Sequence, residues 1–389
     1  MFVLLGVILS IAALADISKE EKKGAFFFKV LFLILTLMLC FRYGQGTDYY
    51  PYQLQYENID LLSASLLTNS LYHGETGWYM LMVVFKRLDC SFYLFFAIIA
   101  LVSMWGMYRA INRYSSHKCL SLLIMYPTYY MTYLYSAVRQ GLVVSLFLAY
   151  GLDMLKQKKF VSYYILIFIL SLFHTSALIL IFLPLLIKLR GKTPFFWFTV
   201  AFCIMLIFGF TGILNSIAMR FGIIRYLKFS VSIPAIAVRL LLGYCIIRMQ
   251  QVINQYEHDE DEEEANLYYI YIAGLIIYIT FSFTGTFSQR LTMPMKAVEL
   301  LLIPMQVSLL AQLQNAGNKL PLLRFAFIRN SIPAISVLVI AVLNFELIKN
   351  IDSYIVQGNY FDWVNPLNYP YISIFNEDRI FEYISEFKL

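Results

Sequence analysis

Residues 156–192 read KQKKFVSYYILIFILSLFHTSALILIFLPLLIKLRGK. A long apolar run lies between two clusters of basic residues, and such clusters stay preferentially on the cytoplasmic side of a membrane protein. A single crossing needs only ~20 residues and would put the two clusters on opposite sides. The run is therefore expected to leave the cytoplasm and return as a helical hairpin. Its outer tip would lie at residues 173–176, Phe-His-Thr-Ser.

The composition supports the same class. Of the 389 residues, 60% are hydrophobic and 14% are charged, and the mean hydropathy is +0.68. A soluble chain is less apolar and carries more charge. The net charge of +6 comes from short basic clusters at the ends of apolar runs, which orient helices, so no nucleic-acid partner is expected. The cysteines and the few histidines show no ligand spacing, so no metal site is expected.

Apolar runs recur along the chain and predict an all-α, polytopic integral membrane protein with a single transmembrane domain over residues 1–389. Lysines follow the first run instead of preceding it, which favours an uncleaved helix with its N-terminus outside over a signal peptide. Alternation then places both termini outside. About twelve crossings are expected, at residues 1–15, 25–41, 91–110, 119–135, 137–155, 160–173, 175–187, 195–213, 231–249, 267–284, 291–313 and 330–348.

The connections divide unevenly between the two faces. Three long segments are expected outside, namely residues 42–77, 214–230 and the tail 349–389. The cytoplasmic loop 250–266 carries a run of acidic residues, which is typical of a solvated segment. Residues 78–85 are too few to cross and predict a re-entrant or interfacial helix. Any chemistry is therefore expected at the outer face.

Several arginines oppose the charge bias that orients the chain. Basic residues at the outer face work against that orientation, so a group of them indicates a bound anion. Two of them open helices at polar outer turns, where the guanidinium and the N–H groups of the helix start together suit a phosphate. Extension toward lipid headgroups is the alternative for each. The outer arginines are Arg42, Arg139, Arg220, Arg225, Arg239 and Arg290, and Gln140 and Gln289 flank the two at helix starts.

Three outer side chains are candidates for a general base. Asp48 precedes Tyr49 in FRYGQGTDYYPY, residues 41–52, and aromatic faces beside a carboxylate suit a sugar. An interfacial aromatic belt with Asp48 as a turn residue explains the tyrosines about as well. Glu75 precedes the short aromatic helix, which it could simply cap. His174 lies at the hairpin tip, although a lone histidine is more often a packing residue.

A series of short motifs runs through the expected outer turns. They are Gly46-Thr47-Asp48-Tyr49, Glu75-Thr76-Gly77-Trp78, Val138-Arg139-Gln140, Phe173-His174-Thr175-Ser176-Ala177-Leu178, Gln289-Arg290-Leu291, and Tyr369-Pro370-Tyr371 with Ile374-Phe375. In their order and spacing they resemble the EpsG-like family of bacterial membrane proteins, which is related to the Wzy-type polymerases of O-antigen and exopolysaccharide assembly. The resemblance covers essentially the whole chain.

The resemblance implies a polysaccharide polymerase with a GT-C-like architecture. Such an enzyme joins oligosaccharide repeat units carried on undecaprenyl pyrophosphate at the outer face of the bacterial cytoplasmic (inner) membrane, facing the periplasm or the exterior. The implied partners are these lipid-linked glycans and the bilayer, with a chain-length regulator and a flippase. No cofactor is implied. Outer arginines would neutralise the departing pyrophosphate, and Asp48, Glu75 or His174 would take the proton of the acceptor hydroxyl.

Three other activities remain open. A flippase or transporter of lipid-linked glycans would also need outer arginines, but it should present charges along a path at mid-depth, where these runs carry few. A glycan O-acetyltransferase would need a cytoplasmic entry for its acyl donor, and the inner loops are short or acidic. A ligase that moves finished glycan to another acceptor performs almost the same chemistry as a polymerase.

Overall fold

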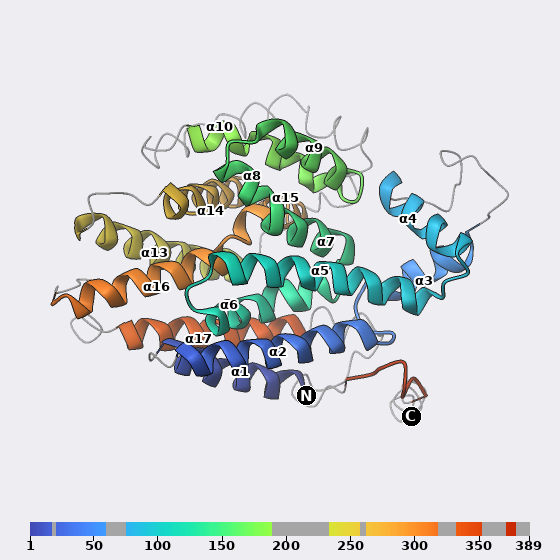
Figure 1. Ribbon diagram of the computed structural model, residues 1–389, viewed down its shortest axis with the longest axis horizontal. Coiled ribbons are helices and arrows are strands. Elements are labelled where there is room, and N and C mark those ends of the chain that lie inside the picture. The colour runs from blue at the N-terminus through green and yellow to red at the C-terminus, as the bar shows by residue number, and fades with distance from the viewer. Residues whose placement is uncertain are drawn as a thin grey trace. The chain divides into compact units, whose positions relative to one another are not determined.

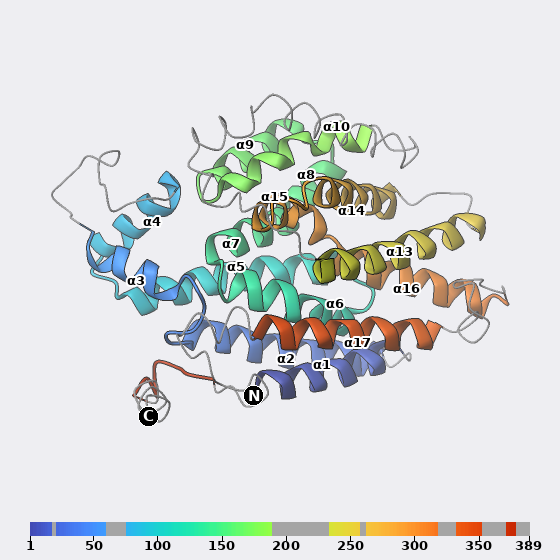
Figure 2. The same cartoon turned by 180° about the vertical axis from the view of Figure 1, so that it is seen from behind.

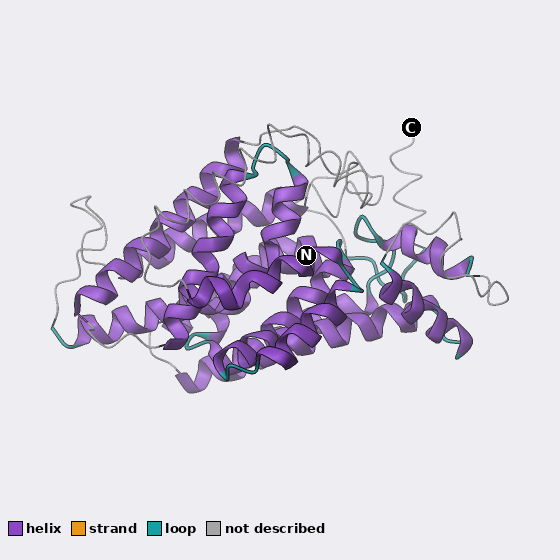
Figure 3. Cartoon of the chain, turned by 90° about the horizontal axis from the view of Figure 1, so that it is seen from above, coloured by secondary structure: helices purple, strands orange, loops and turns teal. Residues whose placement is uncertain are grey.

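The computed structural model describes residues 1–17, 21–59, 75–188, 233–256, 262–317, 332–351 and 371–378 (Figure 1). Within these ranges the chain is helical and contains no strand beyond isolated β-bridges (Figure 3). Among the described helices, four are long and apolar enough to cross a membrane: residues 24–41, 92–114, 138–156 and 235–256. A fifth crossing results if the pair 287–296 and 299–315, bent by 44°, is one span. The protein is therefore an all-helical membrane protein, and the full set of twelve crossings stays a prediction.

Two compact units make up the chain. The first comprises residues 1–152, 168–175 and 335–389, and the second comprises residues 153–167 and 176–334.

In the first unit, α1, α2, α5, α6 and α17 run side by side (Figures 1 and 2). Asn344 of α17 donates to Ser10 of α1 at 2.9 Å, so a polar contact joins these helices. Two short helices, α3 and α4, lie against the first turns of α5. The unit contains α1 (Phe2–Ile17), α2 (Glu21–Phe41), α3 (Tyr49–Glu57), α4 (Thr76–Arg87), α5 (Phe92–Tyr114), α6 (Lys118–Ile124), the π-helix η1 (Met125–Leu134), α7 (Val138–Leu146), the π-helix η2 (Phe147–Gly151) and α17 (Ile332–Asn350).

In the second unit, α13 and α14 pack against α16, and α14 also packs against α15 and α10. Arg239 of α13 pairs with Glu299 of α16 in the buried interior. The second unit contains all or part of the following helices: α8 (Leu152–Lys156), α9 (Phe160–Ser171), the 3-10 helix η3 (Thr175–Phe182), α10 (Leu183–Lys188), α13 (Ile233–Tyr256), α14 (Glu262–Thr280), α15 (Thr286–Lys296) and α16 (Glu299–Asn315).

The expected hairpin over residues 160–187 takes shape as α9 followed by η3 and α10. The helix breaks at residues 172–174, which include His174, where the sequence predicts the tip. Tyr163 of α9 donates to the carbonyl oxygen of Leu180 at 2.7 Å, which holds the two arms together. The side of the membrane on which the tip lies stays a prediction. The short aromatic helix is α4, whose 12 residues are too few to span a bilayer.

Candidate functional site

A tight loop between α2 and α3 positions Asp48. Gly44 and Gly46 have φ angles of 63° and 99°, a region that glycine adopts without strain. Gly46 also lies against the carbonyl of Tyr135, where a Cβ atom would clash. These glycines bring Asp48 to the N-cap of α3, and Tyr52, one turn later, donates to the Asp48 Oδ2 atom at 3.0 Å.

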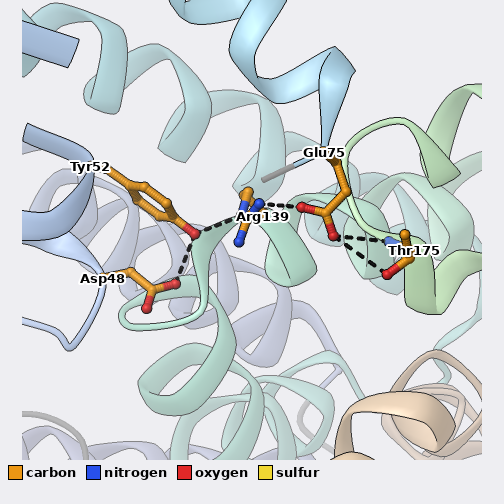
Figure 4. A network of polar contacts seen from close by, with 5 residues as sticks. All are labelled: Asp48, Tyr52, Glu75, Arg139 and Thr175. Atoms are coloured by element: carbon orange, nitrogen blue, oxygen red, sulfur yellow. Dashed lines mark hydrogen bonds and ion pairs between the residues drawn. The ribbon is translucent and has the colours of Figure 1, made fainter. Parts of the chain in front are cut away.

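Arg139 continues this network from the start of α7. Its Nε donates to the Tyr52 hydroxyl oxygen at 2.6 Å, and its Nη1 forms an ion pair with Glu75 Oε2. The side chains of Arg139 and Glu75 are 14% and 16% exposed, so the pair lies near the surface of its unit without being fully solvated. Figure 4 shows the resulting chain of contacts from Asp48 through Tyr52 and Arg139 to Glu75 and Thr175.

Glu75 connects α4 to the hairpin tip. It is the N-cap residue of α4, yet its side chain makes no capping bond to that helix. Instead Oε1 accepts a hydrogen bond from the backbone N–H of Thr175 at 3.2 Å, while Oε2 binds Arg139. The Gly77 N–H donates to the Leu172 carbonyl at 2.8 Å, and a side chain at Gly77 would collide with this carbonyl. The glycine of the Glu-Thr-Gly-Trp motif therefore permits this close approach.

Burial and the neighbouring Asp48 carboxylate raise the pKa of Tyr52 well above its usual value. Tyr52 thus stays a neutral phenol that donates to Asp48 while it accepts from Arg139. Asp48 itself is half-buried. The network contains two carboxylates and one guanidinium. An anionic ligand that binds Arg139 therefore has to share the guanidinium with Glu75. The arrangement suits a group that accepts a proton beside a fixed cation.

Arg42 lies deeper than a surface anion site requires. It is 4% exposed, and its guanidinium lies 5.0 and 4.7 Å from the ring centroids of Phe96 and Tyr135. Nη1 donates to the carbonyl oxygens of Leu134 and Tyr135, at the C-terminal end of η1, where the helix dipole favours a cation. Burial lowers the pKa of Arg42. The structure therefore places Arg42 in the packing beneath the 133–137 turn.

Two other expected binding residues are core residues. Tyr49 is 1% exposed and packs edge-on against Phe92 and Phe96, and Gln140 is 0% exposed. Neither side chain can face a substrate in this arrangement. Periodicity alone could not separate these residues from surface ones, because the surrounding sequence is rich in aromatic residues on every face.

His174 is half-buried and precedes Thr175, so its backbone joins the network while its base function stays a prediction. Gln289 and Arg290 are half-buried in the first turns of α15, which Gly285 opens with a φ of 61°. They belong to the second unit. Arg220 and Arg225 lie outside the described residues.

Sequence reasoning missed Tyr52 and Thr175, which join the predicted residues to one another. Tyr52 lies four residues after Asp48 and therefore on the same face of α3, which was the available signal. It also missed that Arg239 pairs with Glu299. Across the described ranges, no group of three or more His, Cys, Asp or Glu side chains could hold a metal ion.

Fold and site together define a helical membrane protein in which four motifs converge on one polar network. The family model of the EpsG family matches residues 25–328, most of the chain, and the protein belongs to that family. Membership indicates a membrane protein of polysaccharide biosynthesis. The match includes the whole network and stops before the described tail segment 371–378. Comparisons with curated proteins and with solved structures gave no match.

Proposed function

We propose that this protein is a membrane glycosyltransferase that polymerises oligosaccharide repeat units carried on undecaprenyl pyrophosphate, at the outer face of the bacterial cytoplasmic membrane. One observation carries the proposal. Four motifs far apart in the sequence, those containing Asp48, Glu75, Arg139 and Thr175, meet in a single polar network. A merely structural set of interfacial residues has no reason to converge in this way.

The reaction forms one bond and breaks one. The hydroxyl oxygen of the acceptor sugar bonds to the anomeric carbon of the donor glycan, and the bond from that carbon to the pyrophosphate oxygen breaks. The hydroxyl proton passes to a base, and undecaprenyl pyrophosphate leaves with the electron pair. The enzyme therefore needs a base at the acceptor and a cation at the leaving group.

Asp48 is the base that the network supports best. Tyr52 fixes one of its oxygens at 3.0 Å, and the side chain is only half-buried, so an acceptor hydroxyl can approach it. Glu75 uses one oxygen for Arg139 and the other for Thr175, which makes it a positioning residue. His174, next to Thr175, is the alternative base or an orienting group for the acceptor.

Arg139 is the cation proposed to stabilise the departing pyrophosphate. Tyr52 and Glu75 hold its guanidinium from two sides, so it is oriented before substrate binds. Arg290 remains a proposed anion contact within the second unit, because it also follows a polar turn at a helix start.

The test compares Arg139→Lys with Arg87→Lys in cells that lack the chromosomal gene. Lysine keeps the charge at position 139 but loses the planar fork, so surface glycan should shorten to single repeat units. Arg87 is exposed at the end of α4 and serves as the matched control, which should support normal chains. Polymer length is read from a gel against the amount of protein in the membrane. Full-length polymer from Arg139→Lys would refute the proposed role.

The same cells separate polymerase from flippase. If the protein polymerises, single repeat units reach the cell surface in its absence, because their transport does not depend on it. If it translocates, those units stay on the cytoplasmic leaflet and the surface carries none.

A further inference from the structure

The described tail segment, residues 371–378, is bound to the loop that follows α2; we call it the C-terminal strap. Arg42 and Ser373 form an antiparallel β-bridge. Next to it, the Tyr43 N–H donates to the carbonyl oxygen of Ile372 at 3.0 Å. Figure 1 shows the strap in red, close to the end of the chain marked C. The backbone of the strap therefore fixes the path of this loop, and the loop fixes the strap.

Gln45 strengthens this attachment from inside. Its Oε1 atom accepts from the Ile372 N–H at 3.3 Å and from the Tyr135 hydroxyl at 2.7 Å. Both Gln45 and Ile372 are 0% exposed. A buried amide that joins three segments holds them in one arrangement, because breaking either bond would leave a buried polar group without a partner. The strap is thus part of the folded unit.

The strap brings Glu377 to a group of tyrosines. The rings of Tyr43 and Tyr93 lie 5.9 Å apart at 43°, and their hydroxyls are hydrogen-bonded. Glu377 lies five residues after Ile372, which accepts the Tyr43 N–H, and Tyr50 lies on the Tyr43 side through the ring of Tyr49, 5.9 Å from Tyr43 and 5.5 Å from Tyr50. Burial first, then Tyr93, the Glu377 carboxylate and Tyr50, raise the pKa of Tyr43, in keeping with this arrangement. All four side chains are half-buried and so keep part of their surface accessible. We call Tyr43, Tyr50, Tyr93 and Glu377 the tyrosine patch.

The patch and the polar network lie on different faces of α3. Tyr50 belongs to the patch and Tyr52 to the network, and residues two apart on a helix do not face each other. The helix α3 therefore contributes one side chain to each group, on different faces. The patch also differs in charge, since it contains phenols and a carboxylate but no cation. That chemistry does not suit pyrophosphate.

We propose that the tyrosine patch binds the uncharged sugar units of the glycan chain that the network extends. This inference rests on the proposed function. Aromatic faces pack against the C–H face of a sugar ring, and phenols and a carboxylate supply donors and acceptors for its hydroxyls. The family match covers residues 25–328, and Glu377 in the strap lies after its end. The contribution of Glu377 is therefore not implied by the family match.

The binding test uses the full-length protein in detergent micelles. The probe is the one-repeat and two-repeat oligosaccharide released by mild acid from the polymer of wild-type cells. Saturation-transfer NMR should show transfer from the protein to the sugar C–H protons. Glu377→Gln and Tyr93→Phe each remove about one hydrogen bond, so each should weaken binding about fivefold.

Asp378→Asn is the matched control, because it neutralises the exposed carboxylate beside Glu377 and should leave the binding constant unchanged. Equal binding by Glu377→Gln and Asp378→Asn would overturn the proposal, as would an absence of saturation transfer with the wild-type protein. The patch would then be part of an interfacial aromatic belt. Failure of the proposed function is a separate result: cells with and without the protein would carry glycan of the same length.

Discussion

Two Arg–Glu pairs, one in each unit, differ in what surrounds them. Arg239 lies within α13 and Glu299 is the first residue of α16; their side chains are 10% and 3% exposed, and one guanidinium nitrogen contacts both carboxylate oxygens at 3.0 and 3.1 Å. Arg139 and Glu75 lie at the starts of two helices, beside the Asp48 loop and the hairpin tip. The first pair is enclosed by helices, whereas the second has further polar partners on both sides.

This difference distinguishes a pair that holds helices together, Arg239–Glu299, from a pair in the candidate site, Arg139–Glu75. A buried pair between packed helices adds little net stability, but losing one partner leaves an uncompensated charge. The Arg139–Glu75 pair is partly exposed, so it can exchange one partner for a ligand. The same chemistry therefore serves packing in the second unit and, by our proposal, catalysis in the first.

The largest effect on stability is expected for Arg239→Ala. Glu299 would remain buried without its partner, at a cost of about 3–5 kcal/mol. Thermal unfolding of the detergent-purified protein and its amount in the membrane measure this loss. Replacing both partners, Arg239→Met with Glu299→Leu, should recover most of it. Arg248→Ala on the same helix removes the hydrogen bond that a half-buried side chain donates to the neutral side chain of Gln251, so it is the control and should cost less. Equal losses for Arg239→Ala and Arg248→Ala would contradict this assignment.

The smaller stability effect is expected for Glu75→Gln. Glutamine keeps an oxygen to which Arg139 can donate, so Arg139 is not left without a partner and stability should fall less than for Arg239→Ala. Chain growth should nevertheless fall strongly, because Arg139 loses the group that orients it. The measurement is the melting temperature beside polymer length, with Thr76→Ala as the exposed neighbouring control. A large drop in melting temperature with normal polymer would make this pair scaffold as well, and the contrast between the units would disappear.

Helix positions follow from the apolar pattern because each crossing must satisfy its backbone internally. The run predicted at 25–41 is contained in α2, and the run at 137–155 corresponds to α7, η2 and α8. The run predicted at 291–313 contains a break, since one helix ends at Lys296 and the next begins at Glu299. The sequence signals of that break are Pro294 and the charged residues Lys296 and Glu299. A mean hydropathy taken over the whole run hides them. The run predicted at 195–213 lies outside the described residues.

Asp48, Glu75 and Arg139 could be selected from the sequence, but their contacts could not. Membrane orientation places residues at the same depth, and it says nothing about which of them touch. Arginines opposing the charge bias therefore predicted a shared anion, whereas the structure gives Arg139 an internal carboxylate and encloses Arg42 among rings and carbonyls. Which side chains pair depends on how the helices pack, and the periodicity of a single sequence does not reveal that packing.

The central claim, that this network extends glycan chains, is tested most directly by Asp48→Asn in the purified protein supplied with undecaprenyl-pyrophosphate-linked repeat units. Asparagine keeps the shape and can still accept from Tyr52, but it cannot take the acceptor proton. The account predicts that the wild-type protein forms a ladder of lengthening products, that His174→Gln forms one as well, and that Asp48→Asn forms none while remaining folded. A ladder of wild-type length from Asp48→Asn would contradict it.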